Sequence, residues 1–295
     1  MTRAGTAAVV GKPNAGKSTL LNRLVGEKLS IVSPKPQSTR DRIVGIHTTD
    51  DTQIILLDTP GLLNPRYALQ RAMRATAVRA LAEADVIIYL VDATRAADDT
   101  LSLREAAELS EDPRAPVLLT FSKADLIDAG AAEHLASRAP GALFVSALTG
   151  EGIDGLLSAV RAHLPESPFL YPADELSAQP VRFFAAELVR ETALEQLQDE
   201  LPYSLACEID EFRETREPVY IRAVLHVERE SQKRILIGAG GTRIRAIGEA
   251  ARGKIEALIG RRVYLDLWVK VLPNWRKKPA ALRRFGFHLP EEPSS

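Results

Sequence analysis

The sequence predicts an α/β fold in two parts, a mostly parallel sheet with helices on both faces followed by a smaller α+β domain. Three observations support this prediction. In the first half of the chain, short apolar runs alternate with helix-like stretches, which is typical of parallel strands joined by helical crossovers. A proline-rich break then follows. Beyond the break, the order changes to helix–strand–strand–helix–helix–strand.

The first part is predicted to contain five short, buried strands, at Ala7–Val10, Ile54–Leu57, Val86–Val91, Val117–Phe121 and Leu143–Val145. Helical patterns lie between them, the first directly after Ser18 and the others at Leu69–Leu81, Leu101–Leu109 and Gly155–Leu164. Sheets of this type bind their ligands at the carboxyl ends of the strands. A binding site is therefore expected among the residues that directly follow each strand.

The second part is predicted to consist of three strands and three helices. The helices lie at Phe184–Leu201, Ser231–Ile237 and Thr242–Ile259, and the strands at Leu205–Phe212, Val219–Val227 and Val263–Val271. The last strand places valines and leucines on one face and Tyr264, Asp266, Trp268 and Lys270 on the other. We expect a first domain at residues 1–167, a linker at 168–180, a second domain at 181–288 and a disordered tail at 289–295.

The composition is that of an ordinary globular protein. A chain of 295 residues, of which 45% are hydrophobic and 26% charged, is long enough to form two cores. The single cysteine, Cys207, has no internal disulfide partner and suits a reducing compartment. No apolar run reaches the ~18 residues needed to span a bilayer, and the histidines lack metal-ligand spacing. We expect a cytoplasmic protein, with peripheral contact at the inner face of the cell membrane left open.

Charge is distributed unevenly along the chain. Between Arg229 and Arg284 there are fifteen Lys or Arg residues and four acidic residues, a formal charge of +11. Because the whole chain carries −1, the remainder carries −12. A basic block of this size indicates a polyanionic partner such as nucleic acid, although a solvated surface would also account for it.

The residues after the first strand form a phosphate-binding loop. Gly11-Lys12-Pro13-Asn14-Ala15-Gly16-Lys17-Ser18 matches the pattern G-x-x-x-x-G-K-S between a strand and a helix, and Thr19 follows it. The glycines let backbone N–H groups converge on phosphate oxygens at the positive end of the helix dipole. Lys17 is expected to neutralise the β- and γ-phosphates, and Ser18 to bind Mg²⁺.

Three further strand ends carry residues that a guanine nucleotide requires. Asp58-Thr59-Pro60-Gly61 follows the second strand, and Asp58 is expected to hold Mg²⁺ through water while the Gly61 N–H contacts the γ-phosphate. In Ser122-Lys123-Ala124-Asp125, a buried Asp125 would accept two hydrogen bonds from guanine and reject adenine, and Lys123 would pack over the base. Ser146-Ala147-Leu148 fits a loop that contacts the guanine carbonyl. Together these motifs predict a P-loop GTPase domain.

The segment Ile31–Arg42 is the predicted switch. It contains Gln37-Ser38-Thr39-Arg40, in which Thr39, or Ser38 in its place, would ligate Mg²⁺ only when the γ-phosphate is present. The residue after Gly61 is Leu62, where many small GTPases have a Gln that orients the attacking water. Another group must therefore position the water or stabilise charge.

A glycine-rich loop, Gly238-Ala239-Gly240-Gly241, lies between two predicted helices inside the basic block. A G-x-x-G loop lets a sugar-phosphate backbone approach closely and clamps about four nucleotides. Although such a loop is often only a tight turn between helices, its charge and the element order around it predict binding of single-stranded RNA. Four cations surround it in the sequence, Lys233, Arg234, Arg243 and Arg245.

In these motifs, the chain resembles the Era family of bacterial GTPases from Ala8 to about Gly286. The resemblance rests on residues 11–19, 37–40 and 58–61, and on the C-terminal motifs Ile237–Gly241 and Leu267–Val271. It implies a Ras-like G domain that uses GTP/GDP and Mg²⁺, followed by a type II KH domain. It also implies binding near the 3′ end of small-subunit ribosomal RNA and a role in assembly of the small ribosomal subunit.

Two residues depart from the family pattern. Ser122 stands where the family has an Asn that bonds to the base and to the phosphate loop, so looser nucleotide binding is expected, and Ser38 replaces a Thr. In related GTPases that lack the water-orienting Gln, an Asn at the position of Asn14 helps to bind K⁺, which supplies positive charge at the phosphates. The resemblance thus adds Asn14 to the residues expected to act in hydrolysis, which are Asn14, Lys17, Thr39 and Gly61.

Two other functions stay open at this point. One is an RNA-binding assembly factor whose nucleotide site binds GTP or GDP with little turnover, because Leu62 and Ser122 depart from the pattern of efficient GTPases. The other is a tRNA-modifying or tandem GTPase. The sequence disfavours it, since it has no second phosphate loop and no cysteine near its C-terminus.

Overall fold

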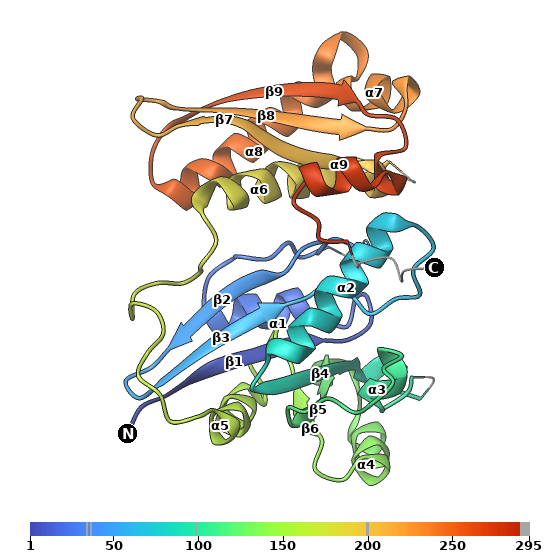
Figure 1. Ribbon diagram of the computed structural model, residues 1–295, viewed down its shortest axis with the longest axis vertical. Coiled ribbons are helices and arrows are strands. Elements are labelled where there is room, and N and C mark those ends of the chain that lie inside the picture. The colour runs from blue at the N-terminus through green and yellow to red at the C-terminus, as the bar shows by residue number, and fades with distance from the viewer. Residues whose placement is uncertain (34, 36, 98, 199–200, 290–295) are drawn as a thin grey trace. The chain divides into compact units, whose positions relative to one another are not determined.

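The computed structural model describes residues 1–33, 35, 37–97, 99–198 and 201–289 (Figure 1). The chain forms two compact units, each with its own sheet and hydrophobic core, and the main division in sequence falls between Ala178 and Gln179. Of the tail predicted at 289–295, residues 290–295 lie outside the described residues.

The first unit contains a six-stranded sheet in the order β2-β3-β1-β4-β5-β6, in which β2 pairs antiparallel with β3 and the other neighbours pair in parallel. The mostly parallel α/β fold is confirmed, and β3 and β4 are buried along their whole length. Its strands are β1 (Arg3–Val10), β2 (Ile43–Thr48), β3 (Thr52–Asp58), β4 (Val86–Asp92), β5 (Val117–Ser122) and β6 (Leu143–Val145). Its helices are α1 (Lys17–Val25), α2 (Ala68–Glu83), α3 (Leu103–Ala106), α4 (Ala129–Arg138) and α5 (Ile153–His163), with 3₁₀ turns at Ala93–Arg95 and Ala124–Leu126.

The structure adds β2 and α4, which the sequence patterns do not predict. In β2, Gly45 breaks the apolar pattern, but a Cβ atom there would meet the Val25 side chain of α1 at 2.6 Å, so glycine lets α1 pack on the strand. Helix α4 buries Leu135 alone and so lacks an apolar stripe. The helix predicted at Leu101–Leu109 is too long: α3 has four residues, and Glu108 beyond it adopts a left-handed φ of 49°.

The chain that follows α5 is irregular and lies against the edge of the sheet at β2 and β3. Gln53 on β3 is fully buried, and its Oε1 accepts hydrogen bonds from the N–H groups of Leu170 and Tyr171. Its amide nitrogen donates to the Tyr171 carbonyl at 2.9 Å. On β2, the Ile46 N–H donates to the Leu176 carbonyl at 2.9 Å. The predicted linker therefore satisfies the buried amide of Gln53 and a backbone N–H of the edge strand β2.

The second unit has a three-stranded sheet in the order β7-β8-β9, with β7–β8 antiparallel and β8–β9 parallel. Helices α6 and α8 pack on one face and form the core with it (Figure 1). This is the α+β architecture predicted. The strands are β7 (Ala206–Arg213), β8 (Val219–Val227) and β9 (Val263–Val271), and the helices are α6 (Val181–Gln196), α7 (Glu230–Ile237), α8 (Thr242–Ile259) and α9 (Pro279–Arg284), with 3₁₀ turns at Pro202–Ser204, Ala239–Gly241 and Trp275–Lys277.

The helices and strands of the second unit agree closely with those predicted from the periodicity of the sequence, with two exceptions. Helix α6 ends at Gln196, before the predicted end at Leu201, because the backbone of Leu197 turns to an extended conformation. Helix α9 was not predicted, because the sequence around it is rich in charged residues and lacks a clear apolar pattern. The strict alternation of β9 is confirmed, since Tyr264 and Trp268 are exposed while the apolar face packs on the core. Among the described residues, no helix combines the length and the apolarity needed to cross a membrane.

Candidate nucleotide site and RNA-binding groove

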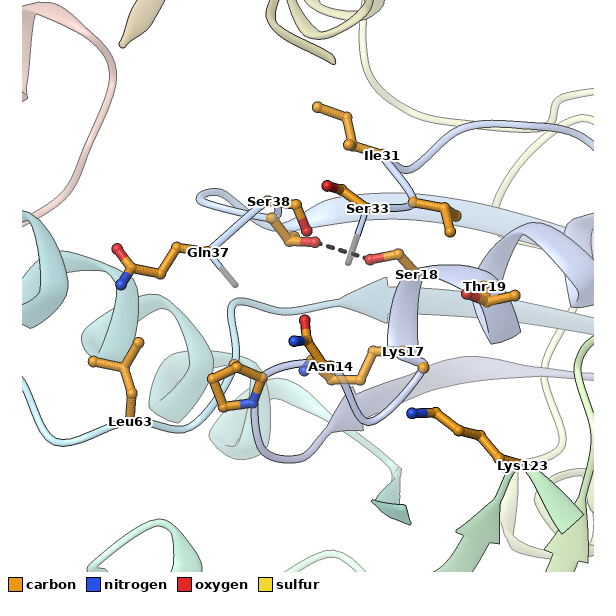
Figure 2. A pocket seen from close by; sticks show the side chains of 15 residues that line it. Asn14, Lys17, Ser18, Thr19, Ile31, Ser33, Gln37, Ser38, Leu63 and Lys123 are labelled. Carbon is orange, nitrogen blue, oxygen red and sulfur yellow. Dashed lines mark hydrogen bonds between the residues drawn. The ribbon is translucent and has the colours of Figure 1, made fainter. Parts of the chain in front are cut away.

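The phosphate loop connects β1 to α1 beside a cavity of about 320 Å³ (Figure 2). A Cβ atom on Gly11 would meet the Leu90 carbonyl oxygen of β4 at 2.2 Å, so no larger residue fits. Asn14 and Gly16 adopt left-handed φ values of 65° and 90°, which Asn and Gly tolerate. About half of the predicted nucleotide-binding residues line this cavity, together with the predicted metal ligand Thr39; they are Pro13, Asn14, Gly16, Lys17, Ser18, Thr19, Gly61 and Lys123.

Lys17 is held inside the phosphate loop. Its ammonium donates to the carbonyls of Gly11 at 3.1 Å and Lys12 at 2.9 Å, and the residue is 6% exposed. Burial lowers the pKa of Lys17 to about 8, although Asp58 opposes the shift. Lys12 points elsewhere and pairs with Asp99 at 2.5 Å. A bound phosphate would replace the carbonyls as the partner of the Lys17 charge.

Nucleotide binding should therefore weaken at alkaline pH. Phosphates favour the charged form of Lys17, so above pH 8 binding must include uptake of a proton, and GDP affinity should fall by about tenfold per pH unit. Calorimetry between about pH 7 and pH 10, in two buffers with different ionisation enthalpies, measures affinity and proton uptake together. A flat affinity with no proton uptake above pH 8 would contradict this assignment of the Lys17 charge.

Three predicted magnesium ligands, Ser18, Thr39 and Asp58, meet at the side of the cavity. The Ser18 hydroxyl lies 2.9 Å from Thr39 Oγ1 and donates to Asp58 Oδ2 at 2.7 Å. Ser38 also lines the cavity, but the contact with Ser18 is made by Thr39. This geometry supports Thr39 over Ser38 as the switch ligand.

Asp58 has the features of a residue that helps to bind a cation. It is fully buried, and its Oδ1 atom has no hydrogen-bond partner among the described residues. Burial raises the pKa of its carboxyl above the usual value, although Lys17 and three hydroxyls oppose the shift. Mg²⁺ prefers oxygen ligands and retains several waters. A carboxylate with a free oxygen beside two hydroxyls fits this ion, with Ser18 and Thr39 as ligands and Asp58 holding it through water.

Ser30 and Asn22 support Asp58 and were missed by the sequence patterns. The buried Ser30 hydroxyl donates to Asp58 Oδ2 at 2.9 Å. Asn22 on α1 holds Ser30 in place: its Oδ1 accepts from the N–H groups of Leu29 and Ser30, and its amide donates to the Ser30 carbonyl. The switch segment is thus tied to α1 directly before Ile31. No sequence signal marks these residues, since neither follows a strand.

The predicted base-binding residues lie at the carboxyl ends of β5 and β6. The Ser122 hydroxyl donates to the Ala15 carbonyl at 2.7 Å, so Ser122 retains a tie to the phosphate loop. Its one proton is used there, which leaves the base without the donor that Asn would provide. Lys123 pairs with Asp92 at 2.5 Å, which sets the position of its stem. Asp92 was also missed, although it ends β4 and the rule of strand ends applies to it.

Two details of the base-binding end differ from expectation or add to it. Asp125 is exposed, where the sequence argument expected a buried carboxylate, because it sits in a surface 3₁₀ turn, Ala124–Leu126. The Ser146 hydroxyl accepts from the Thr149 N–H at 3.1 Å, which shapes the Ser146–Leu148 loop. Ala147 is half-buried and Leu148 is 77% exposed.

Gly61 and Leu62 lie against the phosphate loop. A Cβ atom on Gly61 would meet the Pro13 backbone nitrogen at 2.8 Å, and the Leu62 N–H donates to the Gly11 carbonyl at 2.9 Å. The Leu62 side chain is 4% exposed and packs in the hydrophobic core. It is therefore unavailable to a water near the γ-phosphate, whatever its polarity.

In the second unit, the G-x-x-G loop joins α7 to α8. Gly238 has a φ of 75°, and a Cβ atom on it would meet the Arg243 backbone nitrogen at 2.9 Å. Ala239 and Gly240 are exposed at the tip, and nothing lies within 4 Å of a Cβ placed on Gly240. The tip is thus open to a close approach by a backbone. Arg243 is turned back toward α7, where it donates to the Ile235 carbonyl.

A groove of about 610 Å³ runs beside this loop, between α8 and β9. Of the predicted RNA-binding residues, Gly241 and Arg245 line it, whereas Lys233 and Arg234 lie on α7 outside its lining. Gly248, Arg252 and Leu267 also line the groove and were not singled out in the sequence. Their shared position follows from the packing of α8 on β9, which no local pattern reports.

Comparison with protein families places a GTPase model and a KH model on the two units. The model described as a 50S ribosome-binding GTPase matches residues 6–123, and the KH domain model matches residues 200–276. Proteins named GTPase Era from Carboxydothermus hydrogenoformans and Pseudomonas syringae pv. tomato are 40% and 42% identical to the chain. Each alignment covers 97% of this chain, and they cover 98% and 97% of the two relatives.

Two solved structures are similar over nearly the whole chain. One is a variant of Aquifex aeolicus Era bound to GDP·AlF4⁻, with a TM-score of 0.89 and 38% identity. The other is Era in complex with MgGDPNP and nucleotides 1506–1542 of 16S ribosomal RNA, with a TM-score of 0.88 and 38% identity. Both comparisons cover 98% of this chain and 100% of the other chain.

Proposed function

Because this chain belongs to the Era family of GTPases, we propose that it binds the 3′ end of small-subunit ribosomal RNA and uses GTP hydrolysis as a switch in assembly of the small ribosomal subunit. Its family membership makes it a GTP hydrolase with a C-terminal KH domain. The RNA target and the role in assembly are the proposed part. We place this activity in the cytoplasm and include no membrane contact in it.

The observation that carries the proposal is the presence of two complementary sites in one chain. The first unit has a phosphate loop, a buried lysine and the Ser18–Thr39–Asp58 cluster. The second has an exposed G-x-x-G tip beside a groove within the +11 block. A protein that only hydrolysed GTP would have no use for the second site, and a simple RNA-binding module would have no use for the first.

Related structures support the same ligands here. The Era structure similar to this chain holds MgGDPNP together with nucleotides 1506–1542 of 16S ribosomal RNA, and the Aquifex protein holds GDP·AlF4⁻. By analogy, guanine nucleotide and Mg²⁺ occupy the cavity of the first unit and ribosomal RNA occupies the groove of the second. When bound, Mg²⁺ would neutralise charge between the β- and γ-phosphates. Thr39 can contact the ion from the switch segment, which gives that segment a way to sense the γ-phosphate.

A second candidate is an RNA-binding assembly factor with little turnover, and the burial of Leu62 favours it, because no side chain at that position can orient water. Bound K⁺ would compensate for the missing water-orienting side chain. Asn14 is exposed at the cavity, where its amide oxygen would bind K⁺ beside the phosphates.

Turnover should therefore be higher in K⁺ than in Na⁺ at equal ionic strength, by about tenfold or more. A site that fits K⁺ rather than the smaller Na⁺ is occupied only in K⁺, and the bound ion adds a charge at the phosphates that stabilises the transition state. Asn14→Ala should remove the difference while retaining nucleotide binding. Phosphate release measured with and without RNA gives the rates. Equal rates in the two salts would exclude a role for Asn14, and negligible rates under every condition would favour the second candidate.

The experiment that tests the proposed RNA target is crosslinking in cells followed by sequencing of the attached RNA. Reads should concentrate at the 3′ end of small-subunit ribosomal RNA. The Ala239→Asp/Gly240→Asp variant is the control for specific capture. Reads spread evenly over cellular RNA, or concentrated in transfer RNA, would contradict the proposal.

A further inference from the structure

The face of the second sheet opposite α6 and α8 carries exposed aromatic side chains. Tyr264 and Trp268 on β9 are 59% and 52% exposed, and they are the aromatic members among the exposed large apolar side chains of the described residues. Tyr220 on β8 is the register partner of Tyr264. These three residues are called the β9 platform below. Trp268 belongs to the Leu267–Val271 motif. An exposed indole at this position is needed neither to form the core nor to line the groove.

The rings of the platform are fixed in orientation. Tyr220 and Tyr264 stack with their centroids 5.8 Å apart and their planes 12° apart. The Oδ2 atom of Asp266 accepts hydrogen bonds from the Tyr220 hydroxyl at 3.0 Å, Arg222 Nε at 3.2 Å and Trp268 Nε1 at 3.0 Å. Because these rings are already held in place, little of their side-chain entropy would be lost when a ligand stacked on them.

The other end of the same face is covered by the chain itself. His226 on β8 is 2% exposed, and its ring packs against Phe285, which in turn packs edge-on against the buried Trp275. Arg284 pairs with Glu208 at 2.8 Å beside them. The segment around α9 thus covers the face at His226, whereas Tyr264 and Trp268 remain open to solvent.

The platform is continuous with the groove. Tyr264 lines the groove together with Gly241, Arg245 and Leu267. Strand β9 is an edge strand, so a polymer that leaves the groove can pass over this edge onto the open face. Tyr264 and Trp268 are four residues apart, which is about 13 Å along an extended strand. Lys270, the next outward residue, is exposed and provides a positive charge beyond Trp268.

We propose that single-stranded RNA bound in the groove continues across β9 and stacks bases on Tyr264 and Trp268. This inference rests on the proposed RNA binding of the second unit and extends it beyond the four nucleotides that a G-x-x-G loop clamps. Stacking suits this face because every base has a π-face. Arg222 is paired with Asp266 and Arg213 with Glu211, so the exposed rings are the main contact groups that this part of the face offers.

Tryptophan fluorescence and affinity test this directly on the full chain. The chain has two tryptophans, and Trp275 is fully buried, so a ligand that stacks on Trp268 should quench only the emission of that residue. An oligonucleotide of about ten nucleotides should quench, and its central fragment of about four nucleotides should not. Trp268→Ala should weaken binding of the longer RNA by about tenfold or more and leave the short RNA unaffected.

Two further variants separate stacking from other effects. Trp268→Phe retains a ring and should restore most of the affinity of the Trp268→Ala variant for the longer RNA. Leu258→Ala, which removes an exposed apolar side chain from α8 outside the platform, should bind both RNAs as the parent does. Circular dichroism of each variant verifies that the fold is retained.

The outcomes distinguish this inference from the function on which it rests. If both RNAs bind through Gly238–Gly241 but Trp268→Ala weakens neither and no quenching occurs, the platform does not contact RNA and the inference is overturned. If neither RNA binds the parent protein, the proposed RNA function itself fails. If Trp268→Ala leaves RNA affinity unchanged but removes binding to isolated small-subunit proteins, the platform serves a protein partner and the inference is likewise wrong.

Discussion

Replacement of Asp125 by Asn is expected to change the preferred nucleotide from GTP to xanthosine triphosphate. The Asp125 carboxylate would accept hydrogen bonds from the ring N–H and the exocyclic amine of guanine. Asn presents a donor to one of these groups, and an unpaired donor facing a donor removes affinity. GTP binding should weaken by at least about 100-fold, since sites built on such hydrogen bonds discriminate strongly. Xanthosine triphosphate, which has a carbonyl in place of the amine, should bind more tightly.

Competition binding with both nucleotides measures the change in preference. Asp128→Asn is a matched control: Asp128 lies three residues on, caps α4 by accepting from the Ala131 N–H, and can be replaced by Asn in that role. It should leave GTP affinity within about twofold. The exposure of Asp125 sharpens the test, because the carboxylate gains its specificity only when a base covers it. Unchanged GTP binding in Asp125→Asn would show that guanine is recognised elsewhere.

Introducing Asp at both Ala239 and Gly240 is expected to abolish RNA binding while GTP affinity is retained. Two carboxylates at the exposed tip would repel the phosphate backbone and crowd its approach. Nothing lies within 4 Å of a Cβ placed on Gly240, and its φ of 59° is one that Asp tolerates, so the loop should keep its fold. The loss should be at least about 100-fold for an oligonucleotide from the 3′ end of small-subunit ribosomal RNA.

The matched control for this variant is Ala239→Asn/Gly240→Asn, which adds nearly the same volume without charge. It should lose less affinity than the Asp variant, and the difference should shrink as salt is raised from about 50 to 200 mM, because the repulsion is screened. Calorimetry with GDP verifies the nucleotide site of each variant. If the Asp variant bound RNA as tightly as the parent at matched salt, assignment of this loop to the KH site would have to be abandoned.

The phosphate loop of the candidate nucleotide site could be predicted because its signal is local. Gly11, Gly16 and Lys17 lie within one loop, where the spacing of glycines is dictated by backbone sterics and by the approach of a phosphate. Asp58 and Ser122 are far away in sequence, yet each directly follows an apolar run. Since parallel strands end at one edge of the sheet, the topology rule brings them together without knowledge of any contact. The strict alternation of β9 is equally local, because a strand has a period of two.

Other features depended on contacts between distant segments, and no local pattern reports these. Ser30 donates to Asp58 only because Asn22 on α1 holds it there. Gly45 interrupts the apolar pattern of β2, and only the packing of α1 against it explains why glycine is required there. Asp125 was expected to be buried and is exposed, since burial depends on which segments cover a residue.

The sequence by itself determined the two-part fold, the GTPase class of the first unit and the glycine-rich loop between α7 and α8, because short-range sterics, periodicity and strand ends encode them. Only the tertiary structure decided that Thr39 meets Ser18, that the Leu62 side chain is lost to the core, and that Tyr264 joins the groove to an open aromatic face. These outcomes depend on packing and on hydrogen bonds between residues far apart in the chain. The fold determines which distant residues meet, whereas local propensity determines only the helices and strands that carry them.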